Sequence, residues 1–186
     1  MTPAAPLSPL TLAVLGLLAQ RPLSGYDLRK IFATTSMGHF SASPGAIYPA
    51  LDRLAKDGLI RGKDDLRREL RPKRVFQPTA EGRRVLVADL VRPIGRDDVV
   101  WRLDCLLLRF SFIGDACGKA RTRVFLRQFL AAVEQYLEEL SAQLAQFPRR
   151  CGGAAPNGLY ALEYGLECYR TTARWIRRVL RELSDV

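Results

Sequence analysis

The sequence predicts a mainly α protein with a small β-hairpin, divided into an N-terminal domain of residues 1–92 and a helical C-terminal domain of residues 93–186. Three observations predict this class. Short helical patterns with capping residues fill residues 8–58, and two β-type segments separated by a polar loop follow in residues 59–77. Residues 126–147 and 159–183, separated by a loop at residues 148–156, each repeat apolar side chains at alternating steps of four and three, which is typical of long packed helices.

The first two helices are predicted by their caps and their apolar residues. Ser8 and Pro9 precede an apolar segment that ends at Ala19. This segment is too short to span a bilayer, so we expect a core helix. Ser24 is expected to cap a second helix that continues to Phe32.

A third helix is predicted between residues 43 and 58, with one apolar and one polar face. Ile47, Leu51 and Leu54 share one side at helical spacing, and Gly58 lies where a helix commonly ends in the left-handed conformation. The opposite side suits the major groove of DNA because it presents small, polar and basic groups. The candidate DNA-binding residues of this helix are Ser43, Gly45, Tyr48, Pro49, Arg53 and Lys56.

Individual members of this set have competing interpretations. Pro49 is expected inside the helix, where it lacks an N–H and crowds the carbonyl of Gly45. Tyr48 can be half-buried without touching DNA, and Arg53 can pair with Asp57 at i+4. Tyr26, on the second helix, is expected to be structural rather than a DNA contact.

Two short strands are predicted at residues 59–63 and 74–77, joined by a long basic loop. Three helices followed by such a hairpin describe a winged helix-turn-helix. Cationic side chains at the tip of the wing would contact phosphates and set the position of the protein on DNA. The candidates are Arg67, Arg68, Lys73 and Arg74.

Four motifs resemble the PadR family of bacterial transcription regulators: residues 23–28, 43–54, 58–60 and 79–83. The C-terminal half is similar, in length and pattern, to the longer helical arm of the AphA-like branch. The resemblance implies a winged helix that binds DNA and C-terminal helices that dimerise. It also implies that such regulators often repress, and that some release DNA when a small apolar or aromatic compound binds near the arm or the dimer interface.

The charge distribution agrees with a nucleic-acid partner. The chain has 29 basic and 19 acidic residues, a net charge of +10. Residues 1–92 hold 15 basic and 8 acidic groups, a difference of +7, whereas residues 93–186 hold 14 and 11, a difference of +3. The proposed DNA-binding half therefore carries most of the positive field. The alternative is a basic, well-solvated surface without this role.

The C-terminal half is predicted to be an antiparallel helical hairpin that acts as a dimerisation arm. Its apolar seams are expected to pack against a second copy of the chain, because an isolated hairpin has little to cover its other face. The alternative is that the seams are buried inside one subunit. The candidate dimerisation residues are Leu126, Leu130, Val133, Leu137, Leu140, Leu159, Leu166, Ile176 and Leu180.

Aromatic residues of this half are candidates for binding a small effector, although aromatic residues at helical spacing usually form core. The candidates are Trp101, Phe110, Phe112 and Trp175. The four cysteines, Cys105, Cys117, Cys151 and Cys168, form no C-x-x-C pair, and His39 is the one histidine. The spacing therefore favours packing over a metal or redox site, and we expect no metal and no cofactor.

The function predicted from these features is sequence-specific DNA binding by a transcriptional regulator. We expect a repressor that binds a palindromic operator as a homodimer. A winged-helix adaptor that binds proteins instead of DNA is the alternative. The sequence lacks catalytic motifs, which argues against an enzyme, and it lacks an apolar segment of membrane length or a signal peptide, so we expect a cytoplasmic protein. The operator, the effector and the target genes cannot be read from the sequence.

Overall fold

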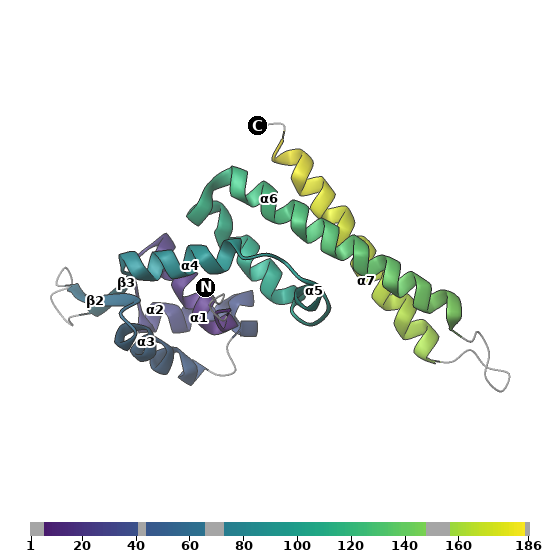
Figure 1. The fold of residues 1–186 in the computed structure, drawn as a ribbon. Coiled ribbons are helices and arrows are strands. Elements are labelled where there is room, and N and C mark those ends of the chain that lie inside the picture. Colours follow the sequence, from purple (N-terminus) through teal and green to yellow (C-terminus); the bar gives the residue numbers. More distant parts are fainter. Residues whose placement is uncertain (1–5, 41–43, 66–72, 148–156, 185–186) are drawn as a thin grey trace. The chain divides into compact units, whose positions relative to one another are not determined.

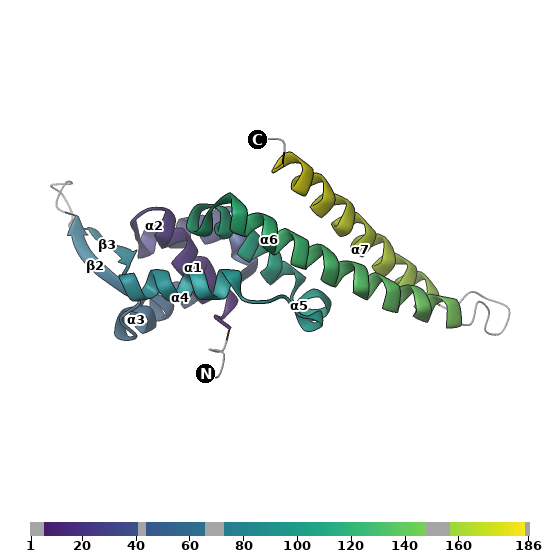
Figure 2. The ribbon, with the colours of Figure 1, turned by 45° about the horizontal axis from the view of Figure 1, so that its top comes forward.

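The computed structural model describes residues 6–40, 44–65, 73–147 and 157–184 (Figures 1 and 2). The chain forms two compact units. Unit 1 contains Met1–Arg92 and Leu107–Gly118, and unit 2 contains Pro93–Leu106 and Lys119–Val186. The chain thus leaves unit 1 after residue 92, as the predicted boundary has it, but residues 107–118 return to unit 1. The chain therefore passes between the two units more than once.

Unit 1 is built around α1 (Pro9–Gln20). The Ser8 hydroxyl accepts the N–H of Thr11 at 3.2 Å, as the predicted cap requires, and the seven consecutive residues 12–18 are all buried. The next helix, α2 (Gly25–Thr34), begins with a capping box. Ser24 accepts the N–H of Asp27, whose carboxylate accepts the N–H of Ser24 at 3.0 Å. Both predicted helix starts are confirmed.

The third helix, α3 (Ile47–Lys56), follows two short 3-10 segments, η1 (Ser36–Phe40) and η2 (Pro44–Ala46). The α-helix therefore starts later than predicted. Pro49 is its third residue, so it lies in the first turn, where backbone N–H groups have no partner within the helix. The prediction of an interior proline that breaks a local rule is wrong for this reason. The predicted end is confirmed, since Gly58 has φ +69°.

The predicted hairpin consists of β2 (Ile60–Asp65) and β3 (Lys73–Pro78), paired antiparallel with Gly62 opposite Phe76. A third strand that the sequence analysis missed, β1 (Leu23–Ser24), pairs with the other edge of β3. The sheet order is β1-β3-β2. Two residues are too few for a visible alternation of apolar and polar side chains, so this strand depends on its partner.

The remainder of unit 1 is α4 (Ala80–Val91) and residues 107–118 of α6 (Leu103–Gln146). Thr79 caps α4 by accepting the N–H of Gly82, and its hydroxyl donates to the carbonyl of Gly58 at 2.7 Å. The buried Arg109 of α6 donates to the carbonyls of Leu90 and Arg92 at the C-terminal end of α4. These bonds join α6 to α4.

Unit 2 contains α5 (Arg96–Trp101), the first four residues of α6, the part of α6 after Gly118 and α7 (Asn157–Glu182). Gly118 has φ +78° and ψ 172°, which interrupts the helical geometry of α6. Beyond it, α6 and α7 run antiparallel, as predicted (Figures 1 and 2). Tyr136 and Tyr169 join the two helices through an edge contact at 4.9 Å between ring centroids.

Further contacts of unit 2 tie α5 to this hairpin. The hydroxyl of Tyr169 donates to the carbonyl of Val99 at 3.0 Å, and Arg96 forms an ion pair with Glu139 at 2.8 Å. No helix of the described residues is long and apolar enough to cross a membrane.

Candidate nucleic-acid interface

Helix α3 separates an apolar face from a polar one, as predicted. Ile47, Leu51 and Leu54 are at most 2% exposed and join the core of unit 1. The predicted DNA-binding residues of the opposite face are exposed, and these are Gly45, Tyr48, Pro49, Arg53 and Lys56. Ser43 lies outside the described residues. The polar face is therefore available to a partner along the described part of α3.

The ring of Tyr48 lies against the backbone of α2. A Cβ atom added at Gly25 would be 2.6 Å from Cε1 of Tyr48, so glycine leaves the space that the ring occupies. The side chain of Tyr48 is nevertheless 48% exposed. Gly25 thus fixes an aromatic ring whose other side faces solvent.

Tyr26 was expected to be structural, but its side chain is 65% exposed. It follows Gly25 in the chain, so two exposed tyrosines flank the contact between α2 and α3. The sequence contained one indication that Tyr26 is exposed. Tyr26 is the second residue of a capped helix and lies off the apolar face that Leu28 and Phe32 form. We add Tyr26 to the candidate interface.

The two strands of the wing place basic residues on both faces of the hairpin. Arg61 and Lys63 are exposed and alternate with Gly62, so they share one face of the hairpin. Predicted residue Arg74 belongs to the other face, and its guanidinium lies 5.6 Å from the ring centroid of Phe76. The side chain of Lys73, which was also predicted, is outside the described part of the chain.

Two further wing predictions, Arg67 and Arg68, fall outside the described residues. The sequence analysis missed Arg61 and Lys63 because it searched the loop for cations. Their signal was the alternation of basic residues around Gly62 in the first strand.

The four predicted effector residues are divided between the units. Phe112 is 3% exposed and Phe110 is half-buried in unit 1, whereas Trp101 is 77% exposed and Trp175 is half-buried in unit 2. No single cluster of the four is seen within either unit, as far as the described residues go. Phe112 fits the alternative of a core residue, since its ring lies where a Cβ on Gly16 would be.

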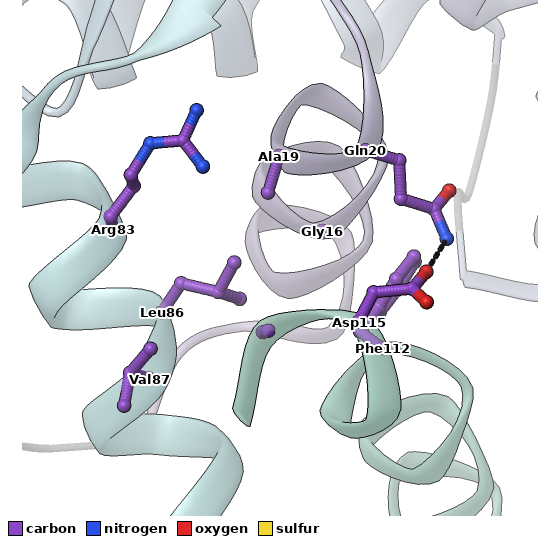
Figure 3. Close-up of a pocket in the computed structure, with 9 residues that line it drawn as sticks. Gly16, Ala19, Gln20, Arg83, Leu86, Val87, Phe112 and Asp115 are labelled. Atoms are coloured by element: carbon purple, nitrogen blue, oxygen red, sulfur yellow. Dashed lines mark hydrogen bonds between the residues drawn. The ribbon is translucent and has the colours of Figure 1, made fainter. Parts of the chain in front are cut away.

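Unit 1 has a pocket of about 140 Å³ between α1, α4 and α6, and Phe112 is the predicted residue that lines it (Figure 3). Leu86 and Val87 of α4 and Ala19 of α1 form apolar parts of the lining. The polar parts are Arg83 and a hydrogen bond of 2.8 Å from Nε2 of Gln20 to Oδ2 of Asp115. The pocket is thus mostly apolar with charged groups at its edge.

The predicted dimerisation residues are covered to different degrees. Leu126, Val133, Leu140, Leu166 and Ile176 are at most 6% exposed within one chain. Leu130, Leu137, Leu159 and Leu180 are half-buried. Because the first five already pack inside their own subunit, they have little surface left for a partner, and other residues of the arm must supply that surface.

Cys105 and Cys168 are free thiols. Cys105 is buried, Cys117 is half-buried and Cys168 is exposed, while Cys151 lies outside the described residues. Burial raises the pKa of the Cys105 thiol. The described residues contain no group of three or more histidine, cysteine or acidic side chains that could hold a metal ion.

Comparison with known proteins finds similarity to one family. Residues 14–88 match the model of the transcriptional regulator PadR-like family. The curated negative transcriptional regulator PadR of Bacillus subtilis is 24% identical over 176 residues, which cover 90% of this chain and 93% of the relative.

Solved structures with similar chains belong to the same group. Bacillus subtilis PadR in complex with operator DNA is 24% identical, covers 94% of this chain and 98% of its own, and has a TM-score of 0.43. The same protein in complex with p-coumaric acid is 23% identical over 97% of this chain and 98% of its own, with a TM-score of 0.42. A PadR-like regulator from Bacillus cereus is 26% identical over 98% and 99% of the two chains, with a TM-score of 0.43. Residues 14–88 of the chain are thus similar to the PadR-like family of transcriptional regulators.

Proposed function

We propose that this protein is a repressor that binds a palindromic operator as a homodimer and leaves it when a small aromatic effector binds. The observation that carries the proposal is the exposed face of α3, where Tyr48, Arg53 and Lys56 lie opposite three buried apolar residues. The name of the curated relative, a negative transcriptional regulator, supports repression. A cytoplasmic location is part of the proposal, because the operator is bacterial DNA.

The face of α3 offers the chemistry that reads a major groove. Arg53 or Lys56 can donate hydrogen bonds to the O6 and N7 acceptors of guanine, a contact that contributes about 1–3 kcal/mol of discrimination. The hydroxyl of Tyr48 can donate to a phosphate while Gly25 holds its ring. Tyr26 is placed to add a second hydroxyl.

The wing supplies contacts that do not depend on sequence. Arg61 and Lys63 of β2 are exposed on one face of the hairpin and can neutralise phosphates. In this proposal, Arg67, Arg68, Lys73 and Arg74 extend the same role toward the tip. Two copies related by a two-fold axis would place their recognition helices about 34 Å apart, which matches a palindromic site.

The test is a salt titration of operator binding, with operators selected from random duplexes by the purified protein. We expect Arg61→Ala/Lys63→Ala to weaken binding to all duplexes and to lower the slope of log affinity against log salt by about 0.9 for each lost phosphate contact. We expect Arg53→Ala/Lys56→Ala to lower the preference for the selected operator over random duplexes. The matched control is Arg127→Ala, which removes an exposed arginine from α6 and should change neither quantity. An unchanged preference after Arg53→Ala/Lys56→Ala would contradict the proposed use of α3.

The pocket of unit 1 is the proposed effector site. Leu86, Val87 and Phe112 can hold an aromatic ring, and Arg83 can receive a carboxylate at its edge. We expect p-coumaric acid, the compound bound in one relative's crystals, to lower operator affinity. Ala19→Phe, which places a ring in the pocket, should abolish this response but retain operator binding; an unchanged response would exclude the pocket.

The alternative function is a winged-helix adaptor that binds proteins. An adaptor of this kind would not need the exposed basic residues of α3 and β2 to contact the same DNA duplex. Salt-sensitive retention on duplex DNA separates the two proposals, because an adaptor need not show it.

A further inference from the structure

The C-terminal half of α7 holds a concentration of positive charge that the proposed function does not use. Residues 170–181 contain five arginines and no acidic residue. All five are exposed, and they are Arg170, Arg174, Arg177, Arg178 and Arg181. Because like charges three or four positions apart on a helix repel each other, an anion that lies among them stabilises this segment.

Three of these arginines line a groove in unit 2. Arg170, Arg174 and Arg177 follow each other at steps of four and three, so they lie side by side on one face of α7. The groove has a volume of about 350 Å³, and Leu137 of α6 also lines it. The groove therefore follows the contact between the two long helices and gathers three guanidinium groups along one side.

The base of the groove is apolar. Ala173, which lines it, is 2% exposed and belongs with Leu166 and Ile176 to the buried apolar stripe of α7. Leu137 is half-buried. Guanidinium groups beside such a surface are less well hydrated than in open solvent, so their hydrogen bonds to a bound anion are stronger.

The two outer arginines of the groove are held by ion pairs. Nη1 of Arg170 lies 2.7 Å from Oε1 of Glu167, which precedes it in α7. Nη2 of Arg177 lies 2.5 Å from Oε1 of Glu134 in α6. Each pair uses one terminal nitrogen, and a guanidinium has five N–H donors, so both arginines keep donors for a ligand.

The central arginine, Arg174, makes no ion pair within the described part of the chain. Its Nη2 donates to the hydroxyl of Thr171, a neutral acceptor, at 3.0 Å. The three guanidinium groups thus share the carboxylates of Glu134 and Glu167, and one positive charge has no paired carboxylate among the residues that the structure describes. A ligand suited to this groove supplies negative charge and several hydrogen-bond acceptors.

We propose that the groove binds the phosphate group of a small phosphorylated compound. A phosphate monoester carries a charge of about −1.5 to −2 at pH 7 and three acceptor oxygens, whereas a carboxylate has a single charge and two oxygens. One phosphate group can therefore accept hydrogen bonds from Arg174 at the centre and from Arg170 and Arg177 at the sides. Leu137 contacts the organic part of the compound. The inference goes beyond the proposed function, because neither the DNA face nor the pocket beside Phe112 contributes to this site.

Titration of the full-length protein with AMP tests the site, with the Nε–H signals of the arginines followed by NMR at constant ionic strength. We expect the wild type to saturate with a Kd of at most about 1 mM. Arg174→Ala should weaken binding by at least about tenfold. Arg174→Lys, which keeps the charge but loses the planar fork, should bind with an affinity between those of the wild type and Arg174→Ala.

The matched control is Arg181→Ala, which removes an exposed arginine of the same helix outside the groove and should leave the Kd for AMP unchanged. Equal losses for Arg174→Ala and Arg181→Ala would show general attraction between charges and overturn the inference. A wild type that does not saturate would overturn it as well. Circular dichroism of each variant checks that the helices are retained.

Further measurements separate a phosphorylated compound from other sources of phosphate. Adenosine should not bind, and inorganic phosphate should bind more weakly than AMP because it lacks an organic part; the opposite result for either probe would overturn the inference. In a salt titration of operator binding, Arg174→Ala should keep the slope of the wild type. A slope lower by about 0.9 would assign Arg174 to a DNA phosphate instead. Binding of AMP and binding of the operator are measured separately, so this inference and the proposed function can fail independently.

Discussion

Helices α1 and α7 show how differently the two units cover their apolar residues. Seven of the 12 residues of α1 are buried, in one unbroken run, whereas three of the 26 residues of α7 are buried. Helix α1 contacts α3, α4 and β3, so it is enclosed from several sides. Helix α7 runs along α6 and contacts α5 through the hydrogen bond from Tyr169 to Val99, and most of its described residues are exposed or half-buried.

Helix α1 is thus enclosed within unit 1, whereas most residues of α7 in unit 2 are exposed or half-buried. Unit 1 exposes Tyr26 and Tyr48 beside cations, on the face that we assign to DNA. Unit 2 exposes Trp101, Tyr160 and Tyr164 on α5 and α7. Large exposed aromatic residues are typical of a surface that binds a protein partner.

The largest expected effect on stability comes from replacing one glycine by alanine in each unit and comparing the two variants. Gly82→Ala would place a methyl group on the carbonyl oxygen of Leu59, and this backbone atom cannot move aside like a flexible side chain. We expect a loss of about 3 kcal/mol in the free energy of unfolding. Gly165→Ala in α7 meets no atom within 4 Å and should stabilise by up to about 1 kcal/mol. Urea denaturation of dilute samples measures both; equal losses would contradict the difference in packing between the units.

Gly25→Ala should weaken operator binding by about tenfold with little change in stability. The added methyl group would meet the ring of Tyr48 at 2.6 Å and displace it from α2, whereas alanine is well accepted in a helix. Fluorescence anisotropy with labelled operator gives the affinity. In a Tyr48→Ala background, Gly25→Ala should have no further effect, and an additive loss would show that it acts elsewhere.

Ser24→Ala should cost about 1 kcal/mol, because it removes one half of the capping box of α2. Hydrogen exchange should become faster in α2 and remain unchanged in α5. Helix α5 has only half of such a box, since its cap is Gly95 and the contact is the carboxylate of Asp98 accepting the N–H of Gly95. Faster exchange in both helices would argue against independent units.

The smallest expected effect concerns the exposed pair Glu81–Arg84 of α4. The hydrogen bond from Arg84, followed by its charge, lowers the pKa of the Glu81 carboxyl. The Glu81–Arg84 pair therefore contributes its full stabilisation above the ordinary pKa of glutamate. This stabilisation is lost as the pH falls through the lowered pKa of Glu81. Arg84→Ala should return the pKa of Glu81 to its ordinary range in an NMR titration. A pKa that stays low would assign the shift to the helix N-terminus instead.

Local signals predicted most of unit 1. Ser8, Ser24 and Thr79 cap helices as their positions in the sequence indicate, and Gly58 ends α3 in the left-handed region. The split of α3 into buried and exposed faces followed from its periodicity alone. Pro49 was misplaced because the sequence does not show that a 3-10 segment precedes α3, which moves the proline into the first turn.

The candidate sites were less predictable because they depend on which surfaces remain open. Leu166 and Ile176 have the spacing of a dimer seam, and α6 of the same chain can satisfy that spacing equally well. Tyr26 gave a weak signal because exposure is a property of the folded chain. The pocket beside Phe112 unites residues from three helices, and no local pattern brings Gly16, Arg83 and Asp115 together.

The sequence by itself determined where helices begin and end and which of their faces are apolar, because capping and periodicity act between residues within a few positions of each other. The tertiary structure decided the pairing of β1 with β3, the return of residues 107–118 to unit 1, and which stripe of α7 lies against α6. Each of these features requires contacts between residues that are distant along the chain. Several segments have similar apolar surfaces, so the sequence pattern alone does not show which two of them pack together.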